Sequence, residues 1–223
     1  MGTPLGIFGG TFDPVHFGHL RLAEEAAESL GLERVRWIPA GQPTHRRLEN
    51  KPPRVAAAHR LEMVRLAIAG NARFELDPAQ TEADGPSYTV PTLERLRLSS
   101  ECGAQQPLVL LVGADAFAGL PTWHRWESLF DLAHIAVAHR PGFPIETGSL
   151  PPALAAIYQQ RHCDSPSALE GAPGGRIVTF AMTQLDISAT QIRRLLANQG
   201  SPRYLLPDAV IAYIENQHLY PEK

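Results

Sequence analysis

The chain alternates short apolar runs with amphipathic segments of helical length. The run at 108–112, LVLLV, is apolar at every position, as expected of a parallel strand that helices cover on both faces. Further strands are expected at 5–8, 35–38, 135–138 and 177–180, and helices at 20–30, 55–69, from 91 through 96, 188–196 and about 208–218. Strands separated by helices require crossover connections. The pattern therefore predicts an α/β fold with a parallel sheet.

The length of the chain favours one domain. With 223 residues, it can bury one sizeable core. The segment between Pro141 and Gly175 is rich in Pro, Gly and Ser around a short helical piece at 153–160. Because a structureless loop of that length is unusual in a compact domain, we expect an insertion at about 141–175 within a single domain spanning 1–223.

The composition excludes several classes of protein. A formal net charge of -3 provides no broad basic surface for nucleic acid. Only two cysteines occur, Cys102 and Cys163, without the spacing of a metal site or a disulfide framework, which fits a cytoplasmic protein. No apolar run approaches 18 residues, so we expect no membrane segment.

The stretch GGTFDPVHFGHL, residues 9–20, follows the first expected strand. Glycines between a strand and a helix allow backbone N–H groups to approach phosphates. Neither GxGxxG nor GxxxxGK[ST] occurs here, which argues against a dinucleotide fold of the usual kind and against a lysine-based phosphate loop. His16 and His19 are three residues apart, so they lie on one side of the helix start, at its anion-attracting end.

Two other interpretations of the histidine pair remain open. The histidines could cap the helix and be solvated at the surface. Alternatively, Asp13, His16 and His19 could be three metal ligands, although the glutamate of a zincin motif is missing.

A second stretch, ISATQIR at 187–193, suggests how the first one functions. Ser188 and Gln191 form a capping-box pattern that starts a helix. Thr190 and Arg193 share a face of that helix, and arginine offers a planar fork suited to phosphate. Together, HxGH at 16–19 and this stretch resemble the two signatures of the nucleotidyltransferase superfamily, with Ala189 where a second serine is common.

A closer resemblance, to the bacterial nicotinate mononucleotide adenylyltransferases, extends over about residues 6–220. It rests on GIFGGTFDPVHFGHL, IPAGQPTHR, GPSYTVPTL, VGADAFAGLPTWHRWESL, and ISATQIRRLL with LLPDAVIAYI. The resemblance implies a Rossmann-like doubly wound sheet with C-terminal helices. It also implies adenylyl transfer from ATP to nicotinate mononucleotide in NAD biosynthesis, with release of pyrophosphate and with Mg²⁺ carried mainly by the ATP phosphates.

The resemblance also implies roles for individual residues. The expected catalytic residues are His16, His19, Arg46 and Arg193. The expected ATP-binding residues are Gly9, Gly10, Thr11, Phe12, Gly113, Asp115, Ser188 and Thr190. The expected nicotinate mononucleotide-binding residues are His45, Tyr88, Thr89 and Trp123, with backbone N–H groups near Thr89 meeting the carboxylate and Trp123 stacking on the ring. No protein metal ligand is expected.

Simpler roles remain open for several side chains. Asp115 could cap the next helix, Tyr88 could be a packed turn residue, and Trp126 is expected to be a core aromatic. Arg140 could reach the nucleotide. The remaining histidines belong to no recognisable constellation: His59, His124, His134, His139, His162 and His218.

Three alternative functions also remain. A sister nucleotidyltransferase would act on another phosphate, such as phosphopantetheine or a polyol phosphate. A metal-dependent hydrolase would use Asp13, His16 and His19, and a nucleotide sensor would bind without releasing pyrophosphate. The oligomeric state is left open by the sequence.

Overall fold

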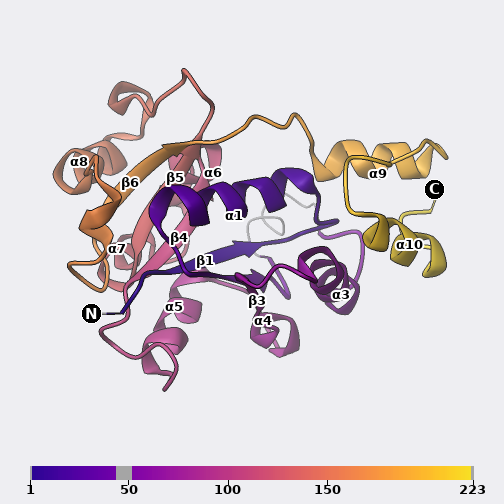
Figure 1. Ribbon diagram of the computed structural model, residues 1–223, viewed down its shortest axis with the longest axis horizontal. Helices are drawn as coiled ribbons and strands as arrows, with labels where there is room; N and C mark the ends of the chain where they lie inside the picture. The colour runs from indigo at the N-terminus through magenta and orange to yellow at the C-terminus, as the bar shows by residue number, and fades with distance from the viewer. Residues whose placement is uncertain (1, 44–51, 222–223) are drawn as a thin grey trace. The chain divides into compact units, whose positions relative to one another are not determined.

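The computed structural model describes residues 2–43 and 52–221 (Figure 1). Within these residues six strands form one sheet in the order β3-β2-β1-β4-β5-β6. The pairs β1–β4, β4–β5 and β5–β6 are parallel. The strands are β1 Leu5–Gly10, β2 Arg34–Pro39, β3 Phe74–Leu76, β4 Leu108–Gly113, β5 His134–His139 and β6 Ile177–Ala181. The expected Rossmann-like α/β fold is confirmed.

Helices occupy most of the segments between the strands. They are α1 Phe17–Leu30, α3 Ala57–Ile68, α4 Ala79–Glu82, α5 Thr89–Leu98, α6 Ala114–Ala118, α7 Leu129–Leu132, α8 Pro152–Arg161, α9 Ala189–Ala197 and α10 Asp208–Asn216. Short 3₁₀ turns lie at Leu120–Thr122, Trp126–Ser128, Thr147–Ser149 and Pro166–Leu169. Every strand and helix expected from the sequence is found, with shifts of a few residues at the ends.

Two kinds of element escaped the sequence analysis. Strand β3 has only three residues, all half-buried, so it leaves no periodic signal. Helices α4, α6 and α7 have four or five residues each, which is too short for a helical stripe to be recognised.

The chain divides into two compact units. Unit 1 contains residues 1–9, 22–36 and 88–183, and unit 2 contains residues 10–21, 37–87 and 184–223. The expectation of a single domain with an insertion at about 141–175 stays a prediction. Within that segment α8 covers the helical piece expected at 153–160.

In unit 1, α6 packs against β4 and β5, and α7 packs against β5 and α5. Strand β4 is buried over its first five residues, as its unbroken apolar sequence predicts. In unit 2, α3 packs against α10 and β3, and α9 and α10 are the C-terminal helices, drawn in yellow tones in Figure 1. No helix in the described parts of the chain has the length and apolar character needed to cross a membrane.

The strand order reverses its direction between β1 and β4, which pair in parallel with Leu5 opposite Leu108 and Ile7 opposite Leu110. In open α/β sheets ligands bind outside the carboxyl ends of the strands at such a reversal. Gly9 lies at the carboxyl end of β1 and Gly113 at that of β4. The topology therefore directs attention to the segments that follow these two glycines.

Candidate active site

Residues 10–20, here called the histidine loop, are held by the ring of Phe12. This side chain is only 2% exposed, and its backbone is left-handed, with φ 49°. Its ring centroid lies 5.3 Å from that of Trp37 and 5.1 Å from that of His19. A Cβ atom on Gly10 would lie 2.7 Å from Phe12 Cζ. Gly10 is therefore required by the packing of Phe12, a reason that the sequence analysis did not identify.

His16 and His19 form a reciprocal cap at the start of α1. The His16 N–H donates to His19 Nδ1 at 3.2 Å, and the His19 N–H donates to the His16 carbonyl at 2.9 Å. An imidazole that accepts through Nδ1 carries its proton on Nε2 when it is neutral. The capping interpretation thus accounts for the hydrogen bond at His19 Nδ1. The donor group of the neutral ring is Nε2–H.

The two imidazoles pack against each other at a tilt and are neutral at neutral pH. Their ring centroids are 3.7 Å apart with a tilt of 32°. Burial lowers the pKa of His16 to about 4, and burial together with the neighbouring His16 lowers the pKa of His19 well below its usual value. His16 is 6% exposed, so it is not a solvated surface residue. Its Nδ1 is buried and has no hydrogen-bond partner among the residues that the structure describes.

Gly18 lies against the His16 ring. A Cβ atom at this position would be 3.0 Å from His16 Nδ1 and 3.7 Å from the carbonyl oxygen of Ile187. A side chain at this position would therefore press on the imidazole. The second contact also places the start of the ISATQIR stretch beside the histidine loop.

Arg193 joins the two sequence motifs. Its Nη1 donates to the backbone carbonyl of Asp13 at 2.6 Å and lies 3.8 Å from Asp13 Oδ2, while Nη2 donates to Thr190 Oγ1 at 3.2 Å. Asp13 is three residues before His16. Within unit 2 the structure thus brings the guanidinium of the second motif to the loop that carries both histidines.

Asp13 is a buried anchor. Its side chain is 1% exposed. Oδ1 accepts a hydrogen bond from the Tyr220 hydroxyl at 2.8 Å, and Oδ2 accepts one from the Arg54 N–H at 2.9 Å. Burial, followed by the charge of Asp13, raises the pKa of the Tyr220 hydroxyl far above its usual value, so this group remains a donor. Both carboxylate oxygens of Asp13 are therefore used within the protein.

The proposed metal set of Asp13, His16 and His19 finds no support in this geometry. In the described parts of the chain, no group of three or more His, Cys, Asp or Glu side chains could hold a metal ion.

Helix α9 starts as the capping pattern predicts. Ser188 is the N-cap, and its Oγ accepts a hydrogen bond from the Gln191 N–H at 3.1 Å. Ser188 and Thr190 are exposed, while Arg193 is half-buried. The start of α9 therefore presents two hydroxyl groups close to a guanidinium, which suits an anion.

Arg60 is a residue of this region that the sequence analysis missed. Its guanidinium is buried and donates to four backbone carbonyls. Nε donates to Val55 at 3.4 Å, and the two Nη atoms donate to Thr11 at 2.8 Å, Ala40 at 2.5 Å and Gly41 at 2.7 Å. It therefore ties the histidine loop to the segment after β2. The available signal was an arginine in register with the apolar face of α3, which also buries Met63, Val64 and Ile68.

In unit 1 the end of β4 is open. Gly113 is the N-cap of α6, and a Cβ atom added to it would meet nothing within 4 Å. Asp115 is exposed in the first turn of that helix and does not cap it. The capping role considered for Asp115 is therefore wrong, because Gly113 occupies that position.

The start of α5 carries the residues expected near the nicotinate. Thr89 is the first residue of the helix, and Tyr88 is its N-cap with extended backbone and no side-chain capping bond. The Tyr88 ring packs on His124, with centroids 4.5 Å apart and a tilt of 32°. The side chain of Tyr88 thus has a packing role. The N–H groups in the first turn of α5 form the end of the helix that attracts anions.

Residues 121–125, here called the tryptophan loop, are attached to α5 at two places. His124 packs on Tyr88, and Arg125 forms a two-pronged ion pair with Glu94, at 2.7 and 3.2 Å. Trp123 between Thr122 and His124 is half-buried. The tryptophan loop, which carries the Trp123 indole, is therefore attached to α5, the helix that begins at Thr89. His124, to which the sequence analysis assigned no constellation, helps to attach this loop.

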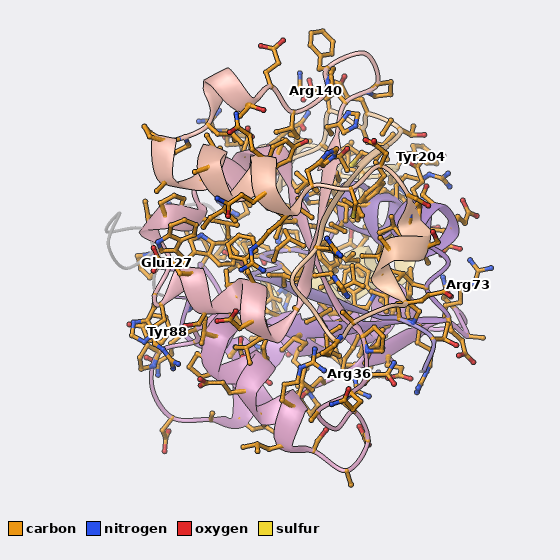
Figure 2. The ribbon with its side chains drawn as sticks, turned by 90° about the vertical axis from the view of Figure 1, so that its left-hand side faces the viewer. Arg36, Arg73, Tyr88, Glu127, Arg140 and Tyr204 are labelled. Carbon is orange, nitrogen blue, oxygen red and sulfur yellow. The ribbon has the colours of Figure 1, made fainter. Side chains whose placement is uncertain are left out.

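The remaining sequence predictions have simpler outcomes. Trp126 is half-buried and packs edge-on against Phe130, with ring centroids 6.1 Å apart. Arg140 follows β5 directly and is exposed (Figure 2). His45 and Arg46 lie outside the described residues.

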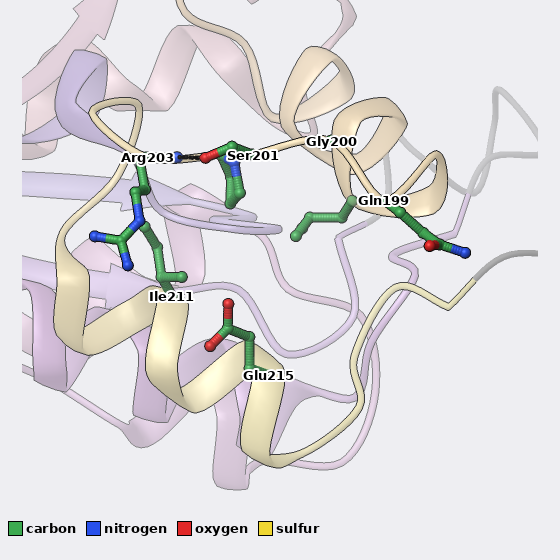
Figure 3. A pocket seen from close by; sticks show the side chains of 8 residues that line it. Gln199, Gly200, Ser201, Arg203, Ile211 and Glu215 are labelled. Carbon is green, nitrogen blue, oxygen red and sulfur yellow. Dashed lines mark hydrogen bonds between the residues drawn. The ribbon is translucent and has the colours of Figure 1, made fainter.

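A cavity of about 340 Å³ lies between the end of α9 and α10 (Figure 3). It is lined by residues 196, 199–203, 211 and 215. None of these is a predicted site residue, so the cavity shares no residue with the sites predicted for ATP and for nicotinate mononucleotide.

Comparisons with known proteins identify the family of the chain. A family model described as cytidylyltransferase-like matches residues 7–195. A relative from Dechloromonas aromatica, named a probable nicotinate-nucleotide adenylyltransferase, is 65% identical, with 99% of both chains covered. A relative of the same name from Pseudomonas aeruginosa PAO1 is 49% identical, covering 99% of this chain and 98% of the relative. The chain belongs to the nicotinate-nucleotide adenylyltransferase family.

Solved structures show the same fold. The nicotinic acid mononucleotide adenylyltransferase of Plasmodium falciparum, complexed with NaAD, aligns with a TM-score of 0.70 at 15% identity, over 98% of both chains. A putative nicotinate-nucleotide adenylyltransferase from Vibrio parahaemolyticus aligns with a TM-score of 0.63 at 14% identity, over 100% of this chain and 98% of the other. The family membership and enzyme class expected from the resemblance over residues 6–220 are confirmed.

The lowered pKa of His16 predicts a pH-dependent stability for this adenylyltransferase family member. Between pH 6.5 and about 4 the unfolded chain binds a proton at this position and the folded protein does not. The free energy of unfolding should therefore fall as the pH falls through this range. The His16 contribution amounts to about 2 kcal/mol between pH 7 and pH 5. Urea unfolding of the wild type and His16→Asn at both pH values measures it.

The expected result is a smaller loss of stability in His16→Asn, since His19 and the other titrating groups remain in both proteins. An equal loss in the two proteins would contradict the buried, neutral state of His16.

Proposed function

We propose that the protein transfers the adenylyl group of ATP to nicotinate mononucleotide, giving nicotinate adenine dinucleotide and pyrophosphate. The observation that carries the proposal is the hydrogen bond of 2.6 Å from Arg193 to the Asp13 carbonyl. It brings the second motif to the loop of His16 and His19, as a shared triphosphate site requires. The names of the relatives and of the solved structures support the same reaction.

The ATP phosphates are assigned to residues of unit 2. His16 and His19 donate to oxygens of the α-phosphate, and Ser188, Thr190 and Arg193 receive the β- and γ-phosphates. In this assignment Phe12 contributes only through its backbone and its packing, because its side chain is buried. The remaining ATP contacts are assigned to Gly9, Gly10, Thr11, Gly113 and Asp115.

Nicotinate mononucleotide is assigned to α5 and the tryptophan loop. The first N–H groups of α5, near Tyr88 and Thr89, meet the nicotinate carboxylate, and Trp123 stacks on the pyridine ring. The N–H donors at this helix start favour binding of a carboxylate, whereas they offer no acceptor to the NH₂ group of nicotinamide. His45 is assigned to the mononucleotide, and Arg46 is assigned to the reacting phosphates, to which it supplies positive charge.

The reaction proceeds by direct in-line attack. A phosphate oxygen of nicotinate mononucleotide forms a bond with the α-phosphorus of ATP, and the bond from that phosphorus to the bridging oxygen breaks as pyrophosphate leaves. No covalent enzyme intermediate is formed, because the attacking group is already anionic. The protein contributes position and electrostatic stabilisation.

Neutral imidazoles suit this task. A lysine would attract the phosphates equally in the ground state and the transition state, whereas a placed donor such as His19 Nε2–H favours the charge that develops on the α-phosphate oxygens. The burial that lowers both histidine pKa values fixes these rings as neutral donors before ATP binds.

Mg²⁺ is proposed to be held mainly by the ATP phosphates and water. The donor set agrees, since the Asp13 carboxylate is committed to Tyr220 and Arg54, and Mg²⁺ usually keeps waters and substrate oxygens as ligands. When bound, the ion neutralises charge on the phosphates. A cytoplasmic location is proposed on the free thiols Cys102 and Cys163.

A panel of acceptors tests the proposed function. The protein is mixed with ATP, Mg²⁺ and one acceptor, and pyrophosphate is followed. We expect the highest kcat/KM with nicotinate mononucleotide, and a value lower by on the order of 10²-fold or more with nicotinamide mononucleotide. Equal values for these two would contradict the carboxylate site. Faster release with phosphopantetheine or a polyol phosphate would indicate a sister enzyme, and ATP binding without release would indicate a sensor.

Two substitutions test the role of His19. In His19→Asn the amide oxygen can still accept the His16 N–H, but the Nε2–H donor is lost; His19→Ala loses both. We expect kcat to fall roughly 10²–10³-fold in both variants, the effect of one missing oxyanion donor, with little change in ATP affinity. Steady-state kinetics and ATP titration measure this. Near-normal turnover of His19→Asn would show that His19 serves only as a cap.

A further inference from the structure

We propose that Tyr220, near the C-terminus, is a positioning residue for the reaction, which holds the histidine loop in its reactive geometry through the Asp13 carboxylate. The proposal rests on the proposed function, because it assigns Tyr220 an effect on the step that His16 and His19 assist.

The first observation is the contact between Tyr220 and Asp13. Tyr220 is 7% exposed, and its hydroxyl donates to Asp13 Oδ1 at 2.8 Å. The two residues are 207 positions apart in the chain. A buried hydroxyl that donates to a buried carboxylate forms a strong hydrogen bond, and its loss leaves the carboxylate with an unsatisfied acceptor.

The second observation is that Asp13 is restrained from several directions at once. Tyr220 and the Arg54 N–H take the two carboxylate oxygens, and Arg193 takes the backbone carbonyl. Removing the Tyr220 hydroxyl therefore releases one side of a residue whose other contacts remain. The chain can then shift at Asp13 without unfolding.

The third observation is that the segment between Asp13 and the histidines is short and buried. Only Pro14 and Val15 separate Asp13 from His16, and both are buried, Val15 completely. On the far side, the Phe17 N–H donates to the Leu205 carbonyl at 3.0 Å. The residues that place His16 are thus held at both ends by the C-terminal part of unit 2, and a displacement at Asp13 is passed to the rings.

A small displacement matters for this kind of catalysis. Donors that stabilise a transition state act only within hydrogen-bond distance, and a shift of about 1 Å can cost roughly 10²-fold in rate. ATP also contacts α9 in the proposed arrangement, so its affinity depends less on the exact place of the imidazoles. The expected signature of Tyr220 is therefore a change in kcat with little change in KM.

The test compares Tyr220→Phe with Tyr213→Phe. Tyr213 is also a tyrosine of the C-terminal part of unit 2, and its hydroxyl lies 2.9 Å from His59 Nδ1, between α10 and α3. Each variant loses one hydroxyl that has a hydrogen-bond partner. For Tyr220→Phe we expect kcat to fall about 10-fold, with KM for ATP within about twofold. For Tyr213→Phe we expect an unchanged kcat.

A second measurement does not depend on activity. Amide hydrogen exchange at Phe17 and Leu20, which donate to Leu205 and His16, should accelerate about 10-fold in Tyr220→Phe and remain unchanged in Tyr213→Phe. Asp13→Asn keeps the size of the anchor and an oxygen for the Arg54 N–H. Adding Tyr220→Phe to Asp13→Asn should cause no further loss of kcat, because both changes act on one contact.

Three results would overturn the proposal. They are a kcat of Tyr220→Phe within twofold of the wild type, an equal loss of kcat in the two tyrosine variants, and unchanged exchange at Phe17 and Leu20. A wild-type protein that releases no pyrophosphate would instead refute the proposed function, and the exchange experiment would still decide whether Tyr220 holds the loop.

Discussion

The place of the histidine loop depends on the contacts of Asp13. Its carbonyl accepts from Arg193, and its carboxylate accepts from Tyr220 and the Arg54 backbone. These contacts bring residues that are far apart in the chain to a loop whose own aromatic ring, Phe12, packs edge-on against His19. A buried carboxylate is stable only when its oxygens are satisfied. The same contacts that satisfy Asp13 therefore set the backbone from which His16 and His19 project.

The histidines illustrate how burial selects a chemical role. Burial lowers the pKa values of both rings, and the neighbouring His16 lowers that of His19 further. Neutral imidazoles donate hydrogen bonds without carrying a permanent charge, which distinguishes this loop from phosphate loops that rely on lysine. The protein instead places its permanent charge on Arg193, which a separate helix carries. In the proposed reaction, this separation assigns the leaving group and the reacting phosphate to different residues.

Sequence reasoning found the elements and motifs whose signals are local. The run at 108–112, the helical periods and the Ser188 cap all follow from neighbouring residues, and the structure contains them. It missed Arg60 and Tyr220, because their partners are backbone carbonyls and a carboxylate distant in the chain. It also assigned Gly10 to ATP binding and did not anticipate the Phe12 ring, which a Cβ atom at Gly10 would meet. Such contacts depend on tertiary packing, which no local pattern encodes.

The central claim is that two neighbouring neutral imidazoles and the Arg193 guanidinium bind one triphosphate. A crystal structure with a non-hydrolysable ATP analogue and Mg²⁺ tests it most directly. The account predicts His16 and His19 within hydrogen-bond distance of α-phosphate oxygens, and Arg193 with the first turn of α9 on the β- and γ-phosphates. A triphosphate bound elsewhere, with Arg193 contacting only Asp13 and Thr190, would contradict it.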